Sequence, residues 1–248
     1  MTRWLQVQRV DDPAVRVCCV PRAGGSARDF DYWPAVLGPR VELCAVQLPG
    51  RLSRFREPPM TSLSAVAAEV ATALTDCAEL PTVLFGDCMG SLVVFEVARE
   101  LRRRGAALPS ALMVASYLPP DELRSTEPYH DRDEEALRGR LAEVGGVSPE
   151  VLEDDELFEL MLPTLRADFS LFETYVYRAE DPLPSDVVAL VGATDPYVDA
   201  AAMRGWGRHT AGAFEVRTFG GGHFFLRDST DAVMLVRDRA LGLAAGDR

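Results

Sequence analysis

One segment in the first half of the chain places a thiol where it could act as a nucleophile. The stretch "TVLFGDCMGSLVVFEVARELRRRG", residues 82–105, has the pattern of an apolar strand, a tight turn and a helix. Its turn, "GDCMG", matches the Gly-x-Ser-x-Gly pattern of a nucleophile elbow, with Cys88 in the place of the serine. Glycines are needed there because the central residue is strained and flanking side chains would collide with neighbouring backbone. The pattern therefore predicts that Cys88 is a nucleophile.

Two opposing influences act on this thiol. The start of a helix lies at the positive end of the helix dipole and offers free backbone N–H groups, which favour the thiolate. Asp87 precedes Cys88, and its carboxylate opposes the thiolate by like-charge repulsion. The net effect depends on the direction in which the Asp87 side chain points.

A nucleophile of this type needs a base, and the chain contains three histidines. His223 lies in "GGGHFF", after an apolar strand-like segment and after the nucleophile in chain order, which is the order that this elbow motif predicts for the base. We expect His223 to be the base. His209 falls in the last turn of an expected helix, where a cation is stabilised, and His130 falls in a charged stretch that we expect to be solvated.

The acid that orients this imidazole is expected beyond the strand at 187–191. The segment "GATDPYV" places Asp195 in a turn after that strand, where its carboxylate could orient His223 and stabilise it when protonated. Asp199 is the alternative, although its position is typical of the first residue of a helix.

An acyl-transfer site also needs two N–H donors for the oxyanion. One donor is expected from Met89, the residue after the nucleophile, and the other from the loop "PRAGGSA" after the first strand. Gly24 and Gly25 allow an unusual backbone path in this loop, and we assign the second amide to Ala23. An ordinary glycine-rich turn is the alternative interpretation of the loop.

The elements that position these residues alternate between short apolar strands and helices. This order predicts an α/β fold with a mostly parallel central sheet and helices on both faces, formed as a single domain over residues 1–248. The expected strands are 15–20, 41–47, 82–85, 111–116, 187–191 and 214–219. The expected helices are 63–80, 91–104, 198–209 and 230–243.

The alternation stops between about residues 119 and 184, where the chain becomes charged and helical. Because this insertion follows the end of a strand, where open α/β sheets bind ligands, we expect a helical lid over a pocket. Two amphipathic helices that only cover the core are the alternative. Apolar residues near helical spacing support the helical interpretation, namely Leu152, Leu157, Leu160, Met161 and Leu165.

Composition excludes several classes of function. A formal net charge of −12 argues against a nucleic-acid-binding protein. No segment reaches the roughly 18 apolar residues of a membrane span, and the N-terminus lacks the pattern of a signal peptide, so we expect a cytoplasmic protein that does not bind membranes. The five cysteines show no Cys-x-x-Cys spacing, and the Gly-x-Gly-x-x-Gly fingerprint is absent. We therefore expect no disulfide framework, no metal and no dinucleotide cofactor.

Several segments together resemble the type II thioesterases that accompany polyketide synthases and nonribosomal peptide synthetases. These segments are "CVPRAGGSARDFDYWPAVL", "VQLPGRLSRFREPPMTSL", "LFGDCMG", "LRADFSLFETYVY" and "GGGHFFL". The resemblance implies an α/β-hydrolase fold with a helical lid, and a substrate held as a thioester on the phosphopantetheine arm of an acyl or peptidyl carrier protein. It also implies that Cys88 is the nucleophile, Asp195 the acid and His223 the base, with oxyanion amides at Ala23 and Met89.

Two positions depart from the pattern of this family. Where the family usually has Pro-His-Ala-Gly-Gly, this chain has Arg22, and where it usually has Gly-His-Ser-Met-Gly, this chain has Asp87 and Cys88. Opposite charges now stand on loops that should converge at one site. We therefore expect an Arg22–Asp87 ion pair that shields Cys88 from the carboxylate and braces the oxyanion loop.

A cysteine in the place of serine leaves two enzymatic functions open. Acyl transfer from pantetheine to serine gives an oxoester, whereas transfer to Cys88 gives another thioester and is nearly balanced in free energy. The leading interpretation is a thioesterase that hydrolyses carrier-bound acyl groups through an acyl-Cys88 intermediate. The alternative is an acyl- or aminoacyltransferase that moves the group between carriers, and a further alternative is an inactive carrier-binding scaffold.

Two groups of arginines could contact such a carrier. Arg51, Arg54 and Arg56 follow the "LPG" segment, and residues 102–104 end the helix after the elbow. They could bind the pantetheine phosphate or an acidic carrier, or they could be ordinary solvated surface charges.

Overall fold

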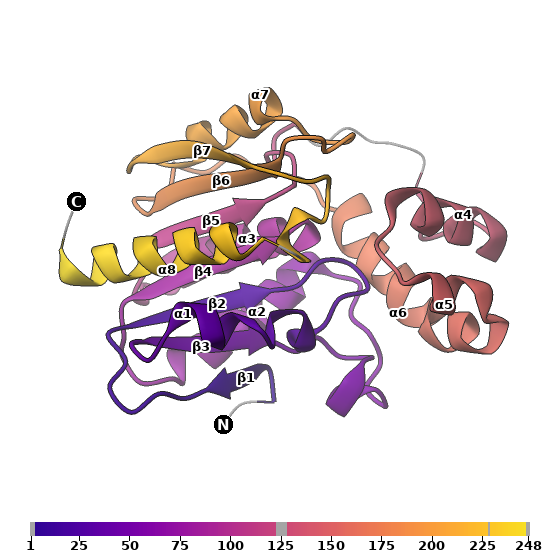
Figure 1. Ribbon diagram of the computed structural model, residues 1–248, viewed down its shortest axis with the longest axis horizontal. Helices are drawn as coiled ribbons and strands as arrows, with labels where there is room; N and C mark the ends of the chain where they lie inside the picture. Colours follow the sequence, from indigo (N-terminus) through magenta and orange to yellow (C-terminus); the bar gives the residue numbers. More distant parts are fainter. Residues whose placement is uncertain (1–2, 123–127, 228, 247–248) are drawn as a thin grey trace.

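A seven-stranded sheet runs through the computed structural model, which describes residues 3–122, 128–227 and 229–246 (Figure 1). The strand order is β1-β3-β2-β4-β5-β6-β7, and β1 pairs antiparallel with β3 while the other neighbours pair parallel. The strands are β1 (Leu5–Gln8), β2 (Val15–Val20), β3 (Val41–Val46), β4 (Thr82–Asp87), β5 (Ala111–Ala115), β6 (Asp186–Gly192) and β7 (Phe214–Phe219).

Helices cover both faces of this sheet, as the alternation of elements predicts. One face packs against α2, α3 and the segment that contains α7, and the other packs against α1 and α8 (Figure 1). The helices are α1 (Trp33–Leu37), α2 (Leu63–Thr75), α3 (Met89–Arg103), α4 (Glu134–Val144), α5 (Pro149–Glu153), α6 (Asp155–Glu173), α7 (Ala200–Met203) and α8 (Thr230–Ala245).

The strand β2 shows why the central strands are mostly apolar; its one charged residue, Arg16, is buried and pairs with Glu42 of β3 over 2.7 Å. Cys18 and Val20 point into the core on one side of the sheet, whereas Val15, Val17 and Cys19 point into the core on the other side. Because both faces are covered by helices, neither set of alternating side chains reaches solvent. The α/β prediction from these apolar segments is confirmed.

Several expected boundaries were wrong. The edge strand β1 and the short helix α1 were not expected, and the helix expected over 63–80 ends at Thr75, with Asp76 as its C-cap. The helix expected over 198–209 consists of α7 followed by a 3-10 helix, Arg204–His209. This 3-10 segment contains Gly205 and Gly207, and glycine is a poor helix former.

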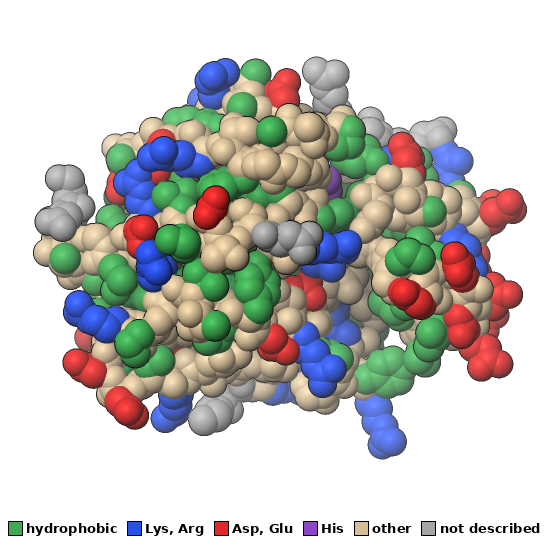
Figure 2. All heavy atoms as spheres, in the orientation of Figure 1, with side chains coloured by type: hydrophobic (Ala, Val, Ile, Leu, Met, Phe, Trp, Pro, Cys, Tyr) green, Lys and Arg blue, Asp and Glu red, His purple; other side chains and the backbone are tan. Residues whose placement is uncertain are grey.

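The insertion contains three helices, α4, α5 and α6, which stand beside the sheet at one end of the molecule (Figure 1). They enclose a small apolar cluster of their own, made of Leu137, Leu141, Val147, Phe158, Leu165 and Phe169. Of the apolar residues near helical spacing, Leu165 is buried, whereas Leu157 and Leu160 are exposed. Acidic side chains gather at the outer end of this insertion (Figure 2). Along the described ranges, no helix is both long enough and apolar enough to cross a membrane.

Candidate active site

Cys88 occupies a strained turn between β4 and α3. Its backbone has φ 50° and ψ −116°, a conformation that L-residues rarely adopt. The flanking glycines are required by space, since a Cβ at Gly86 would lie 2.4 Å from the backbone of Gly90, and a Cβ at Gly90 would lie 2.3 Å from the carbonyl oxygen of Val20. The Cys88 amide donates to Ala115 O over 2.9 Å, which ties the turn to the end of β5. The expected elbow geometry is present.

His223 and Asp195 meet beside this turn. The distance from His223 Nδ1 to Asp195 Oδ2 is 2.9 Å, and the Asp195 side chain is fully buried. Asp195 also accepts hydrogen bonds from the amides of Tyr197 (2.9 Å) and Val198 (3.1 Å). Burial raises the pKa of Asp195, but the hydrogen bonds from His223 and these amides outweigh it, so the net pKa is lowered and the carboxylate is charged. Asp199, the alternative acid, instead caps α7.

The electrostatics of His223 favour its protonated form. Burial lowers the pKa of His223, but hydrogen bonds with Asp195 and Cys88, and the charges of both partners, raise it to about 10. The imidazole therefore lies between the buried carboxylate and the sulfur. This row of three groups can hold a proton on the imidazole while the sulfur carries negative charge.

The other two histidines lie in separate surroundings. His209 Nε2 is 2.8 Å from Asp121 Oδ1, and its ring packs edge-on against Phe95, which agrees with a structural role. His130 was expected to be solvated, but its side chain is only 17% exposed and its Nδ1 lies 2.7 Å from Glu173 Oε2. The expectation for His130 was wrong because α6 folds back over the charged segment that contains it.

The two expected oxyanion donors lie close to Cys88. Met89 is the first residue of α3, and Ala23 lines the same cavity as Cys88 and His223. The amide of Gly24, which has φ 70°, donates to Asp168 Oδ2 over 2.7 Å. The loop that carries Ala23 is thus held by a buried carboxylate of α6.

Asp168 and Arg51 form a brace that was not recognised from the sequence. Arg51 contacts both oxygens of Asp168, over 2.8 and 2.6 Å, and it donates to Gly25 O over 2.8 Å. The brace joins three segments: α6, the oxyanion loop and the loop after β3. The segments "LPGR" and "LRADF", which contain Arg51 and Asp168, are among those that carry the family resemblance. Their sequences alone do not indicate that they contact each other.

Burial of the Arg51 and Arg54 side chains contradicts both interpretations of these residues, a carrier-docking patch and solvated surface charges. Arg51 is 8% exposed and Arg54 is 4% exposed. Arg54 donates to Gln47 O and pairs with Glu57 over 2.6 Å, whereas Arg56 remains exposed. At the end of α3, the arginines 102–104 each form an ion pair with Glu100 or Glu180.

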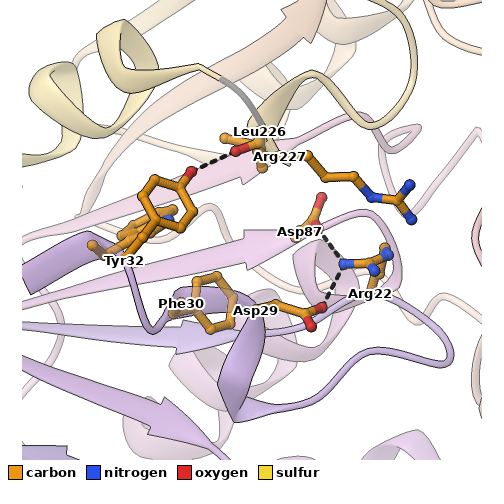
Figure 3. A pocket seen from close by; sticks show the side chains of 8 residues that line it. Arg22, Asp29, Phe30, Tyr32, Asp87, Leu226 and Arg227 are labelled. Carbon is orange, nitrogen blue, oxygen red and sulfur yellow. Dashed lines mark hydrogen bonds and ion pairs between the residues drawn. The ribbon is translucent and has the colours of Figure 1, made fainter. Parts of the chain in front are cut away.

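Arg22 and Asp87 are neighbours, but Asp29 is the closer partner of Arg22. Figure 3 shows the Arg22 guanidinium between the two carboxylates, and its Nη1 hydrogen-bonds Asp29 Oδ2. The distance from Nη1 to Asp87 Oδ2 is 3.9 Å, which is short enough for an ion pair and too long for a hydrogen bond. The expected Arg22–Asp87 pair is therefore present only as the longer contact of a three-membered cluster.

Asp87 is left incompletely satisfied by this arrangement. Among the residues that the structure describes, its Oδ1 and the Nε of Arg22 have no hydrogen-bond partner, and both atoms are buried beside a cavity of about 190 Å³ (Figure 3). Burial raises the pKa of Asp87, and the nearby charge of Arg22 lowers it only in part, so that it reaches about 6. The carboxylate next to the nucleophile thus titrates near neutral pH.

A larger cavity of about 690 Å³ opens on the other side of the elbow, between the sheet and the insertion. Cys88, His223 and Ala23 form its floor, and residues of α4 and α6 form its roof. Seven aromatic side chains line it, namely Tyr117, Tyr129, Phe169, Phe172, Tyr175, Tyr197 and Phe224. Within the described part of the chain, no group of three His, Cys, Asp or Glu side chains could hold a metal ion. The cavity can accept an acyl chain whose carbonyl carbon lies at the Cys88 sulfur.

Comparison with known proteins gives consistent matches over most of the chain. The model of the Thioesterase domain family matches residues 15–240. Thioesterase PikA5 of Streptomyces venezuelae is 39% identical over 220 residues, which cover 87% of this chain and 76% of that protein. A probable cadicidin biosynthesis thioesterase of Streptomyces griseus is 35% identical, over 93% of this chain and 64% of that protein.

A solved structure agrees with these matches. YbtT, described as a type II thioesterase from the yersiniabactin NRPS/PKS biosynthetic pathway, superposes with a TM-score of 0.87. It is 28% identical, and the match covers 97% of this chain and 99% of that chain.

Proposed function

The chain belongs to the thioesterase family, and from this premise we propose that it releases acyl groups held as phosphopantetheine thioesters on carrier proteins of polyketide or nonribosomal peptide synthetases. The observation that carries the proposal is the row of Cys88, His223 and Asp195 at the floor of a cavity large enough for an acyl chain. In this proposal the three residues act as nucleophile, base and acid. The phosphopantetheine arm arrives with the carrier, and the chain uses no cofactor of its own.

The first half-reaction forms an acyl-enzyme. The Cys88 sulfur attacks the thioester carbonyl carbon, and the amides of Ala23 and Met89 donate to the oxyanion that develops. The bond from carbon to the pantetheine sulfur then breaks, and that sulfur takes a proton from His223. Asp195 stabilises the imidazolium until it gives up this proton, consistent with the lowered pKa of Asp195, and then orients the neutral ring.

The second half-reaction releases the product. His223 takes a proton from water, and the water oxygen attacks the carbonyl carbon of acyl-Cys88. The bond from carbon to Cys88 breaks, which leaves a free carboxylic acid and the original cysteine. In this proposal α4, α5 and α6 act as a lid on a single α/β-hydrolase domain and limit the access of bulk water. A cytoplasmic location stays a prediction.

Transfer of the acyl group to a second carrier is the second candidate function, and one observation favours it. The nucleophile is cysteine, so acyl-Cys88 is a thioester whose transfer to another pantetheine thiol is nearly balanced in free energy. Water and a second thiol then compete for the same intermediate. An inactive scaffold is the less favoured alternative, because Cys88, His223 and Asp195 lie together beside an open cavity.

The test is to load one holo carrier with an isotopically labelled acyl group and add the enzyme, with and without a second holo carrier. Intact-mass spectrometry then follows the label. We expect free acid in both mixtures. If the second carrier instead gains label faster than free acid forms, transfer is the main function. The Cys88→Ala variant should lower both products by roughly 10³-fold or more.

A thiol-directed acyl probe separates the enzyme from the scaffold. We expect the probe to label Cys88 in the folded protein and to leave the buried Cys18 and Cys19 unmodified. If Cys88 is labelled no faster than the thiols of the denatured protein and neither product forms, the scaffold is the better assignment.

A further inference from the structure

Arg140 of α4 lines the large cavity and presents one edge of its guanidinium without a protein partner. Its Nη1 lies 2.9 Å from Glu143 Oε2 on the same helix. Within residues 3–122, 128–227 and 229–246, its Nε and Nη2 form no hydrogen bond, and neither atom is enclosed by protein. Because the side chain is 26% exposed, a ligand can reach these two donors.

The charge of Arg140 is only weakly compensated. The side chain of Glu143 is 62% exposed, and an exposed pair of this kind contributes little and exchanges readily with water. Arg22, the other arginine among the described residues that line the cavity, is held more closely by Asp29 and has Asp87 as a second neighbour at 3.9 Å. Arg140 is therefore the arginine of the cavity that is better placed to bind an anion.

Two aromatic rings hold the guanidinium of Arg140 in position. Its guanidinium carbon lies 5.6 Å from the ring centroid of Tyr129 and 5.0 Å from that of Tyr197. Cation–π contacts at these distances are attractive, and they restrict a long side chain that would otherwise lose much entropy on binding. The guanidinium is thus oriented before a ligand arrives.

Tyr197 also connects Arg140 to the reacting groups. Its ring lies edge-on to that of His223 with a centroid distance of 5.4 Å, and its amide donates to Asp195 over 2.9 Å. The guanidinium carbon of Arg140 therefore lies no farther from the His223 ring than 5.0 Å and 5.4 Å placed end to end. A substrate whose sulfur lies beside His223 can carry an anionic group to Arg140 only if that group lies at about this distance from the sulfur.

The phosphate of a phosphopantetheine arm meets this requirement. Between its sulfur and its phosphorus the arm has about as many bonds as four residues of backbone, so it spans roughly 15 Å when extended. This reach is sufficient to bring the phosphate to Arg140 while the sulfur remains beside His223.

The exposure of Arg140 also agrees with the place of the phosphate in a loaded carrier. The phosphate joins the arm to the carrier, which is too large to enter a cavity of about 690 Å³. It must therefore stay at the outer edge of the cavity. Arg140 and Glu143 lie at such an edge, since both side chains are partly exposed whereas Cys88 and His223 form the floor.

We infer that Arg140 binds the phosphate of the phosphopantetheine arm, with its Nε and Nη2 donating to two phosphate oxygens while the thioester carbonyl lies at Cys88. Two parallel N–H···O bonds are the geometry in which arginine recognises phosphate. The inference rests on the proposed function, and it assigns the phosphate contact to a residue other than the arginines that the sequence suggested. The shared chemistry is a phosphate ester, which a carrier presents as a diester and free phosphopantetheine as a monoester.

The experiment compares two substrates that differ only in the phosphate, butanoyl pantetheine and butanoyl 4′-phosphopantetheine, at one ionic strength. Chromatography of the free acid gives kcat and KM for each. We expect the phosphorylated substrate to have a kcat/KM about tenfold higher, as for hydrogen bonds to a charged group, mainly through a lower KM because the contact is remote from the breaking bond. The net charge of −12 would by itself disfavour the phosphorylated substrate, so a preference for it requires a local contact.

Variants assign this preference to one side chain. Arg140→Gln should bring the ratio of the two kcat/KM values to about one or below, and Arg140→Lys should keep part of the ratio because it retains the charge and loses the fork. Arg138→Gln is the matched control on the same helix. Arg138 pairs with Glu134 and Asp155 and is not among the residues that line the cavity, so this variant should keep the wild-type ratio.

A butanoyl-loaded holo carrier tests the diester. We expect Arg140→Gln to raise the KM for this carrier severalfold and Arg138→Gln to leave it near the wild-type value. If Arg140→Gln changes the ratio for the free substrates but not the KM for the carrier, the residue binds only a free phosphate ester and the inference is overturned.

The remaining outcomes separate the inference from the proposed function. Turnover of both free substrates by the wild type at equal kcat/KM would overturn the inference and leave the thioesterase proposal standing. Equal loss of the preference in Arg138→Gln and Arg140→Gln would also overturn it, since disturbance of the insertion would then be the cause. Absence of turnover with both free substrates and with the loaded carrier would instead count against the proposed function.

Discussion

At the scale of single residues, the charge of the buried Asp87 carboxylate is costly to maintain. Its side chain is 9% exposed, one of its oxygens has no partner, and its pKa is raised from 3.8 to about 6. In the unfolded chain this carboxyl loses its proton at a pH about two units lower than in the folded protein. Between about pH 4 and pH 6 the folded protein retains a proton that the unfolded chain has lost, so the free energy of unfolding falls as the pH rises through this window.

Asp87→Asn should therefore stabilise the protein at neutral pH and have less effect in acid. Two pKa units correspond to roughly 3 kcal/mol, of which about 2 kcal/mol should develop between pH 4.5 and pH 7.5. Urea unfolding of the variant and the wild type at both pH values measures the difference. A stability difference that does not change with pH would mean that Asp87 keeps its charge throughout this range.

Cys88→Ser tests whether sulfur or oxygen as the attacking atom decides if the acyl group is hydrolysed or transferred. The variant forms an oxoester, from which transfer to a thiol is uphill, whereas attack by water remains favourable. We expect the ratio of transfer to hydrolysis to fall by roughly tenfold or more, because each 1.4 kcal/mol of unfavourable free energy changes an equilibrium tenfold. The labelled two-carrier assay measures this ratio. An unchanged ratio would show that access of water, and not the acyl-enzyme bond, controls the outcome.

At the scale of elements, the oxyanion loop depends on the helix that roofs the cavity. Asp168 of α6 accepts a hydrogen bond from Gly24 N in that loop and contacts both terminal guanidinium nitrogens of Arg51 in the loop after β3. The Asp168 and Arg51 side chains are buried, so the ion pair cannot be exchanged for water without cost. A displacement of α6 would therefore be transmitted to the amide of Ala23.

Asp168→Asn should lower both stability and catalysis, because it leaves the buried charge of Arg51 without a carboxylate. A loss of about 3–5 kcal/mol is typical when one partner of a buried pair is removed. We expect kcat to fall equally for a small pantetheine thioester and for a loaded carrier, since the oxyanion loop serves both.

The matched control is Asp155→Asn on the same helix, whose side chain is 85% exposed in its pair with Arg138. This change should alter stability by no more than about 1 kcal/mol. If Asp168→Asn lowered kcat for the loaded carrier but not for the small pantetheine thioester, Arg51 would have a role in carrier docking in spite of its burial.

At the scale of the whole molecule, net charge opposes the approach of an acidic partner. The chain carries a net charge of −12, and exposed acidic residues cluster at the outer end of the insertion that contains α4, α5 and α6 (Figure 2). The arginines at the end of α3 are paired with glutamates, so they offer little uncompensated positive charge. Long-range repulsion should therefore slow encounter with an acidic carrier.

Raising the salt concentration from 0.02 M to 0.3 M should increase kcat/KM for an acidic loaded carrier by at least about twofold, because the Debye length falls below about 10 Å above 0.1 M. The kcat/KM for an uncharged acyl pantetheine substrate should show no such increase. Steady-state kinetics at four salt concentrations measures both. A decrease with salt would instead indicate a local positive docking patch that outweighs the net charge.

The sequence by itself determined the parts of this protein that follow from local sterics and pattern. Only glycines fit at 86 and 90, so the elbow around Cys88 could be predicted before any contact was known. Continuously apolar strands such as 111–115 require helices on both faces, which settled the α/β class. The order of Cys88, Asp195 and His223 along the chain likewise predicted that the three side chains lie together; His223 Nδ1 lies 2.9 Å from Asp195 Oδ2, and Cys88 and His223 line one cavity.

Only the tertiary structure decided which partner each buried charge finds. The opposite charges of Arg22 and Asp87 predicted an ion pair between them. In the fold, Asp29 lies closer to Arg22 than Asp87 does. Arg51 and Asp168 lie 117 residues apart in the chain, and no local pattern links them. Burying an unpaired charge is costly, so a buried charged side chain pairs with groups from the segments that pack around it. Tertiary packing decides which segments these are, and the local sequence pattern does not.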